Sequence, residues 1–113
     1  MLLNGGELGG VRVLKPETVE LITSNQIGDL EVTNNPHEGD KFGLGFSIFE
    51  KARDDLPPNL LGGLGWGGFF RTNFLMHPKG NWILVSMSQV VPDSHMSPWM
   101  SEIRKLAAEA IRD

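Results

Sequence analysis

The chain has 113 residues, of which 40% are hydrophobic and 21% charged, with no cysteine and no tyrosine. This length accommodates one domain with a single modest core, and the lack of cysteine excludes disulfides, thiolate metal sites and a cysteine nucleophile. The net charge is −4, and the basic residues form no cluster of the kind that binds a phosphate backbone. Nucleic acid is therefore not expected as a partner.

The sequence also lacks membrane and export signals. No apolar run approaches the ~20 residues that a membrane span requires. The first residues, 1–6, lack the charged start and long apolar stretch of a signal peptide. We therefore expect no membrane partner. The lack of cysteine does not decide the cellular compartment, because an exported protein can also lack cysteine.

The first predicted elements are short. Residues 1–3 are typical of the last turn of a helix, which Asn4 and the two glycines after it would end because they tolerate left-handed backbone. Because these residues predict only the end of a helix, the sequence favours a piece of a longer protein. The alternative is that Met1 is an ordinary start residue. Residues 11–14 predict a short strand or an extended connector.

A short helix is predicted to begin at Pro16, which suits the first position of a helix. Glu17 and Glu20 follow, and their charge is favourable near the positive end of the helix dipole. Gly28 is the expected stop, and the polar residues 29–41 are expected to form a surface loop.

Alternation with a period of two then predicts strands. Residues 42–48 alternate bulky and thin side chains and indicate one strand, which a loop over 51–63 follows. The strongest local signal is a β-hairpin over roughly 66–91. Its turn contains Pro78, which suits the second turn position, and Gly80, which suits a left-handed residue.

The chain ends in a predicted amphipathic helix, with Ser97 as its cap and Pro98 in its first turn. Its predicted apolar stripe comprises Trp99, Ile103, Leu106, Ala107, Ala110 and Ile111. Its predicted solvent-exposed face comprises Glu102, Arg104, Lys105, Glu109 and Arg112. Together these elements predict an α+β fold within the single domain 1–113. It consists of an antiparallel sheet of about three strands, the C-terminal helix packed on one face and a short N-terminal helix.

One glycine motif suggests a nucleotide site. Residues 63–68 match the dinucleotide pattern G-x-G-x-x-G letter for letter. That pattern binds pyrophosphate only between a strand and a helix N-terminus. Here a proline-rich loop precedes it and residues 69–72 are expected to continue as strand, so the nucleotide site is rejected.

The titratable residues suggest no metal or acid–base site. His37, His77 and His95 lack the paired spacing of metal ligands, so no metal or cofactor is expected. His77 is interpreted as a solvated residue of the hairpin turn. Asp29 and Asp40 have no partner that the sequence identifies.

A second glycine motif resembles a peptide-binding loop. Gly43-Leu44-Gly45-Phe46, with Lys41 just upstream, looks like the carboxylate-binding loop of PDZ domains. In that family the backbone N–H groups of the loop grip a peptide C-terminus. A PDZ domain should continue with another strand after its long helix, whereas this chain ends in its helix. Because of this mismatch, the PDZ-like fold is kept only as an alternative.

Trp66, Gly67 and Gly68 are expected to open a strand. Glycine in a strand often marks the close approach of a ligand or another backbone, and a bulge or tight bend under Trp66 is the alternative. Residues 1–8, 11–21, 42–46, 65–68 with Thr72, 77–79 and 87–89 resemble, in this order, the C-terminal portion of the serine β-lactamase-like family. That family includes class C β-lactamases, penicillin-binding carboxypeptidases and related esterases. The resemblance covers nearly the whole chain and implies a partial β-lactamase-like α/β subdomain.

The resemblance implies a substrate-binding strand edge. The family's third catalytic box is Lys-Thr-Gly, which Trp-Gly-Gly often replaces in the esterase-like branch, so Trp66, Gly67 and Gly68 would form that box. The backbone N–H of Phe69 would then supply half of an oxyanion hole, which needs fixed donors close to the reacting carbonyl. Relatives often have small residues and a glycine at Phe70-Arg71, and Arg71 would narrow the site or reach toward an acidic substrate.

The other two boxes are absent. No serine is followed three residues later by lysine, and no tyrosine exists, so no catalytic side chain is assigned to this chain. The family places both boxes upstream of the part that these residues resemble. The resemblance implies a hydrolase that cleaves an amide or ester of a small-molecule substrate through an acyl-enzyme when complete, and an inert segment alone.

Self-association is expected as well, because strands of the family that are missing here would leave a sheet edge and apolar surface open. Two alternatives remain: a free-standing, non-catalytic binding module, and the PDZ-like peptide binder that would use residues 43–46. The sequence does not separate lactam, peptide and ester substrates, or the bacterial periplasm from the cytoplasm.

Overall fold

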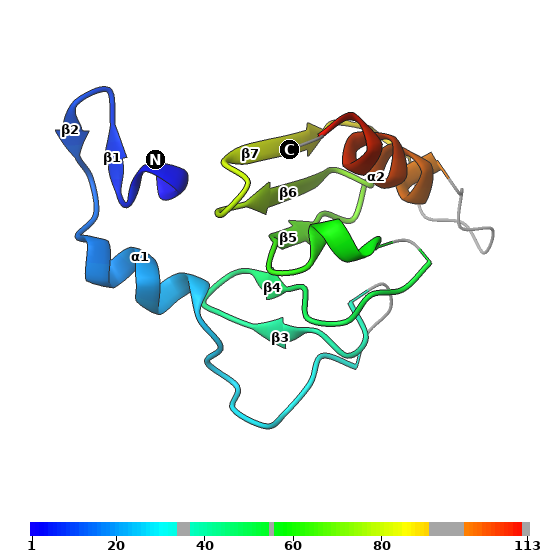
Figure 1. Ribbon diagram of the computed structural model, residues 1–113, viewed down its shortest axis with the longest axis horizontal. Coiled ribbons are helices and arrows are strands. Elements are labelled where there is room, and N and C mark those ends of the chain that lie inside the picture. Colours follow the sequence, from blue (N-terminus) through cyan, green and yellow to red (C-terminus); the bar gives the residue numbers. More distant parts are fainter. Residues whose placement is uncertain (34–36, 55, 91–98, 112–113) are drawn as a thin grey trace.

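The computed structural model describes residues 1–33, 37–54, 56–90 and 99–111. The fold is α+β, with two antiparallel sheets and a helix near each end of the chain (Figure 1). The small sheet pairs β1 (Glu7–Leu8) with β2 (Val11–Arg12). Before it lies the short 3-10 helix η1 (Leu2–Asn4), which Gly5 ends with a φ of +58°, as the sequence predicts.

The main sheet has five strands in chain order, each antiparallel to the next. They are β3 (Lys41–Phe42), β4 (Ser47–Ile48), β5 (Leu64–Gly67), β6 (Asn73–His77) and β7 (Trp82–Ser86). The predicted hairpin is confirmed as β6 and β7, which pair from Asn73 with Ser86 to His77 with Trp82.

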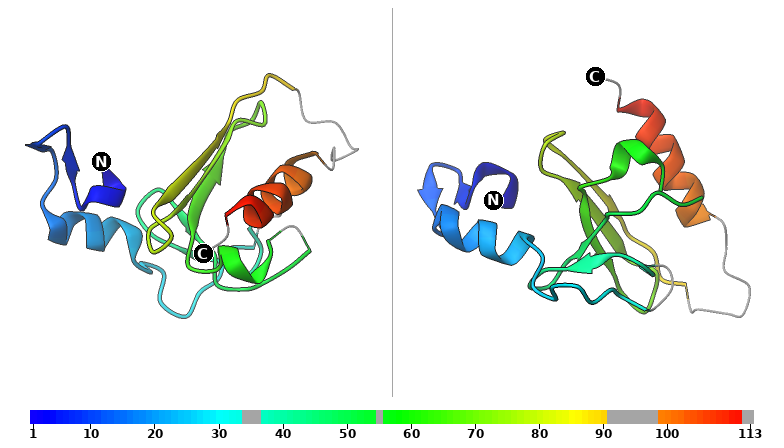
Figure 2. Two further views of the ribbon diagram at one scale, coloured as in Figure 1. Left: turned by 45° about the horizontal axis from the view of Figure 1, so that its top comes forward. Right: turned by 60° about the horizontal axis from the view of Figure 1, so that its bottom comes forward.

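One face of this sheet carries the core. The helix α2 (Trp99–Ala110) and the 3-10 helix η2 (Pro58–Leu60) lie on the same face (Figure 2). The buried cluster consists of Phe49, Leu56, Leu60, Leu75 and Ala108. A hydrogen bond of 2.9 Å from Asn59 Nδ2 to the carbonyl oxygen of Ala108 ties η2 to the last turns of α2.

The N-terminal unit lies toward the opposite face and touches the main sheet at its lower edge (Figure 2). The helix α1 (Pro16–Thr23) carries the carbonyl of Ile22, which accepts a hydrogen bond of 2.9 Å from the Leu44 N–H. A Cβ at Gly43 would collide with that same carbonyl oxygen. Glycine is therefore required where the β3–β4 turn meets α1.

Three sequence-based expectations about strands are wrong. The sheet has five strands rather than about three. Residues 42–48 are two strands joined by a tight turn, closed by a hydrogen bond of 2.9 Å from the Gly43 N–H to the Phe46 carbonyl, and Gly45 adopts a φ of +97°. Residues 69–72 form the turn between β5 and β6 instead of continuing a strand.

The helices also differ from expectation. The helix α1 ends at Thr23, before Gly28, because Ser24 turns to extended backbone. In α2 the buried stripe includes Arg104 and Ala108, whereas Leu106 is 58% exposed, so the stripe is rotated from the predicted one. The predicted cap residues Ser97 and Pro98, like His95, lie outside the described residues.

Candidate functional site

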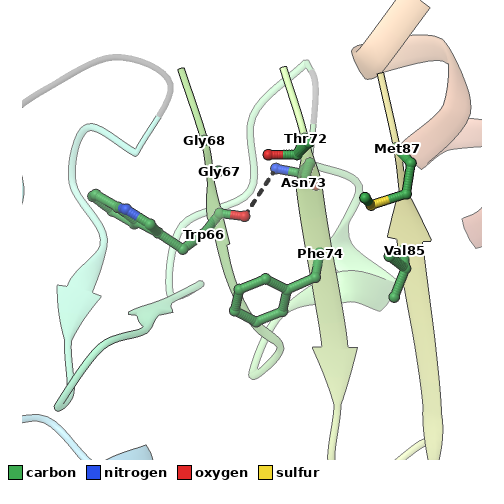
Figure 3. Close-up of a pocket in the computed structure, with 8 residues that line it drawn as sticks. All are labelled: Trp66, Gly67, Gly68, Thr72, Asn73, Phe74, Val85 and Met87. Atoms are coloured by element: carbon green, nitrogen blue, oxygen red, sulfur yellow. Dashed lines mark hydrogen bonds between the residues drawn. The ribbon is translucent and has the colours of Figure 1, made fainter. Parts of the chain in front are cut away.

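A groove of about 280 Å³ lies on the sheet face opposite α2, at the end of β5 (Figure 3). We call it the β5–β7 groove, because its walls come from β5, β6 and β7 with the residues that follow or precede them. Its lining residues are Trp66, Gly67, Gly68, Thr72, Asn73, Phe74, Val85 and Met87. Three of the predicted substrate-binding residues, Trp66, Gly67 and Gly68, are thus brought together at one groove.

Strand register explains the walls of the groove. Trp66 pairs with Phe74 and Phe74 pairs with Val85, so these three side chains share one face of the sheet. Gly67 and Gly68 contribute no side chain. The space beside the aromatic rings therefore stays open above the end of β5.

The backbone of β5 has an open edge beside the groove, on the side that faces β4. The Gly68 N–H donates a hydrogen bond of 2.8 Å to the Thr72 carbonyl. Because antiparallel strands alternate their bonding direction, the N–H and C=O of Gly67 point to the other edge of β5. On that side β4 pairs only with Leu64 and Gly65, so no strand within the described ranges covers the backbone of Gly67.

The remaining two predicted residues lie in the turn beyond the groove. Phe69 is 71% exposed and stacks edge-on against Phe70. In the part of the chain that the structure describes, the Phe69 N–H has no hydrogen-bond acceptor. Arg71 adopts a φ of +65°, its N–H donates to the Gly68 carbonyl at 3.0 Å, and it is not among the lining residues.

A buried polar cluster supports the outer side of Trp66. The His37 ring stacks on Trp66 with centroids 4.6 Å apart, and it lies parallel to Phe49 at 6.2 Å. Its Nδ1 is 3.6 Å from Asp40 Oδ2. Asp40, which is fully buried, accepts hydrogen bonds of 2.9 and 3.1 Å from Arg53 and one of 3.1 Å from Ser47.

The cluster keeps Asp40 ionised. Burial by itself raises the pKa of this carboxyl, but the interactions with His37, Arg53 and Ser47 outweigh burial, so the pKa lies below its ordinary value. A buried carboxylate held by Arg53 on one side and facing the His37 ring on the other fixes the wall behind Trp66. The cluster thus orients one side of the groove without lining it.

Sequence reasoning missed this cluster. Asp40 and Arg53 are far apart in the chain, and only the β3–β4 hairpin brings them together, so no local spacing signals the pair. The interpretation of His77 as a solvated residue is also wrong. Its Nδ1 accepts from the Gly80 N–H at 2.8 Å, so its Nε2 carries the proton and donates to the Leu61 carbonyl at 3.0 Å.

Other kinds of site receive no support from the described residues. Within the described ranges no group of three metal-binding side chains is present. None of the helices there combines the length and apolarity that crossing a bilayer requires. In the loop 43–46, the N–H groups of Gly43 and Leu44 are bonded to Phe46 and Ile22. They are unavailable to a peptide carboxylate, which argues against the PDZ-like alternative.

Comparison with known proteins identifies distant relatives but assigns the chain to no family. No family model matches the chain. Two curated Mycobacterium tuberculosis proteins are similar to it, "Protein Rv1367c" and "Uncharacterized protein MT1414". Each is 34% identical in an alignment 101 residues long, which covers 82% of this chain and 25% of the relative. The chain therefore spans about a quarter of the length of the curated relatives it matches.

Proposed function

We propose that the chain is the C-terminal, substrate-binding part of a serine hydrolase of the β-lactamase-like family. Trp66, Gly67 and Gly68 form the third box, and the edge of β5 receives the substrate beside the β5–β7 groove. The nucleophile and its base come from residues outside these 113. A complete protein of this kind cleaves an amide or ester through an acyl-enzyme.

The observation that carries the proposal is the coincidence of a groove with unused backbone donors. The Gly67 backbone faces an open strand edge, where an extended substrate can add its own hydrogen bonds. The Phe69 N–H follows two residues later, with no acceptor in the described ranges. Fixed N–H groups at a groove are what a developing oxyanion requires.

The length of the relatives is consistent with a substrate-binding part in this chain and a nucleophile outside it. They match the chain over only a quarter of their own length, which leaves room in such a protein for a Ser-x-x-Lys box and a second box. The chain itself contains neither. We therefore propose that the isolated chain binds but does not turn over an acyl substrate.

Self-association is part of the proposal. Ile83 and Val85 on the outermost strand β7 are 53% and 60% exposed, and Met87 just after it is 80% exposed. From residue 80 to residue 90 the sequence has no charged residue. An edge without charge or proline is open to pairing with another strand, and a second copy supplies the same uncharged strand without electrostatic repulsion.

Hydrolysis assays test the proposal. The 113-residue chain is expected to show no turnover of a chromogenic cephalosporin or a short-chain nitrophenyl ester above the buffer rate. Protein Rv1367c from M. tuberculosis, which is longer than this chain, is expected to hydrolyse at least one of these substrates. A fluorophosphonate should abolish that activity. Turnover by the short chain, or inactivity of the folded long protein on every amide and ester tried, contradicts the proposal.

A further inference from the structure

We infer that the β5–β7 groove accepts an uncharged, apolar group, such as the hydrocarbon chain of an acyl ester, and discriminates against a carboxylate. The inference rests on the proposed function in one respect, which is that it takes this groove as the substrate site. It goes further because it selects one of the substrate classes that the resemblance leaves open.

The chemistry of the walls is the first argument. Phe74, Val85 and Met87 form an apolar surface on β6, on β7 and just after β7 (Figure 3). Trp66 borders the groove on β5, with its ring turned away from these three side chains and packed on His37 and Phe42 (Figure 3). None of the lining residues carries a charge. A carboxylate that entered would lose water and gain no cation among the described lining residues, which is costly.

The few polar groups of the groove are gathered at one end. Thr72 and Asn73 lie at the glycine end of the groove (Figure 3). One N–H of the Asn73 amide is already used, since Nδ2 donates to the Trp66 carbonyl at 3.3 Å. A ligand that is polar at one end and apolar at the other fits with its carbonyl near Gly68 and its chain over Phe74 and Val85.

Size is the third argument. The groove volume of about 280 Å³ is roughly twice that of an apolar cavity of ~150 Å³ that holds one benzene molecule. The groove is therefore large enough for an acyl chain of several carbons, whereas a single aromatic ring would leave about half of it empty.

Paired ligands that differ only in charge test this inference. The ¹⁵N-labelled chain is titrated at pH 7 with methyl hexanoate and, separately, with hexanoate, while the amide signals of Gly67, Gly68 and Thr72 are followed by NMR. We expect saturable shifts with the ester and binding about tenfold or more weaker with the anion. Equal or tighter binding of hexanoate, or no saturable shift with either ligand, overturns the inference.

A matched pair of variants locates the effect. V85K places an ammonium group in the groove wall, whereas I83K places the same charge on the same face of β7, outside the lining residues. Both positions are about equally exposed, so both variants should fold and both should weaken self-association alike. V85K is expected to reverse the preference toward hexanoate and I83K to retain the ester preference. Identical behaviour of the two variants contradicts the inference.

The two proposals fail separately. If the long relative hydrolyses nothing but the ester still binds this groove, the proposed function fails and the apolar ligand site stands. If the long relative is a hydrolase but the ester does not bind here, only the ligand class assigned to this groove is wrong.

Discussion

Replacing the buried carboxylate Asp40 by asparagine perturbs the cluster that supports the groove. Asp40→Asn keeps the side-chain volume and removes the charge that faces Arg53 and His37. The Ser47 hydroxyl, now 3.1 Å from Asp40 Oδ2, can still donate to the amide oxygen. What the variant loses is the paired interaction with the Arg53 guanidinium, at 2.9 and 3.1 Å.

The magnitude follows from burial. Removing one partner of a fully buried ion pair costs about 3–5 kcal/mol, because the other charge is left uncompensated. Here the Asp40 side chain is fully buried but the Arg53 side chain is 21% exposed, so the guanidinium can turn toward water. We therefore expect Asp40→Asn to lower the free energy of unfolding by about 2–3 kcal/mol, a large share of the total for one small domain.

Urea unfolding followed by circular dichroism at pH 7 measures this loss. With a slope of about 1.5 kcal/mol per molar urea, the midpoint should fall by about 1.3–2 M. Glu31→Gln is the matched control, because Glu31 binds Lys51 at 2.7 Å in an exposed ion pair and such pairs contribute little. Equal midpoints for the two variants would show that burial of Asp40 does not govern its contribution.

The same pair predicts a pH dependence. The pKa of Asp40 is lower in the folded protein than its ordinary value of 3.8, so the unfolded chain takes up a proton first as the pH falls. The stabilisation by this carboxylate is therefore complete well above pH 3.8 and is lost as the pH falls through the folded pKa. The stability difference between the unaltered protein and Asp40→Asn should shrink in acid; a difference that grows below pH 4 contradicts the assignment.

Two further predictions concern glycines and assembly. Gly65→Ala should lower the free energy of unfolding by about 1–3 kcal/mol, because its Cβ would lie 2.7 Å from the Phe74 carbonyl oxygen and 2.8 Å from the Phe49 ring. Gly67→Ala should change the free energy of unfolding little, since the atom nearest to its added Cβ is 3.4 Å away. Equal losses for the two variants in urea unfolding would refute this explanation. Light scattering after gel filtration should show a mass that rises with concentration, and I83K should reduce it; a clean monomer at all concentrations argues against edge pairing.

Some of the fold could be predicted because its signal is local. The β6–β7 hairpin combines two alternating runs with Pro78 and Gly80 in its turn, and α1 begins at Pro16 as expected. The β3–β4 hairpin shows where such reasoning fails. Its residues alternate like one strand, and the pattern does not reveal that Gly45 takes a positive φ and Gly43 packs on the Ile22 carbonyl.

Features that depend on distant contacts were out of reach. Periodicity indicates that α2 has an apolar stripe, but contacts with η2 and the sheet decide that Arg104 is buried and Leu106 exposed. At the candidate site, the glycines and Trp66 could be singled out from the motif. Their groove also needs Val85 from β7 and Met87 just after it, and its support by His37 and Asp40 depends on a hairpin that the sequence did not show.

Labelling the longer M. tuberculosis relative with a fluorophosphonate, followed by mass mapping of the modified peptide, tests the central claim most directly. The account predicts one labelled serine, three residues before a lysine, outside the quarter of that protein that this chain matches. A folded relative that takes no label, or a label within the matched quarter, would contradict the assignment of the β5 edge to an acyl-transfer site.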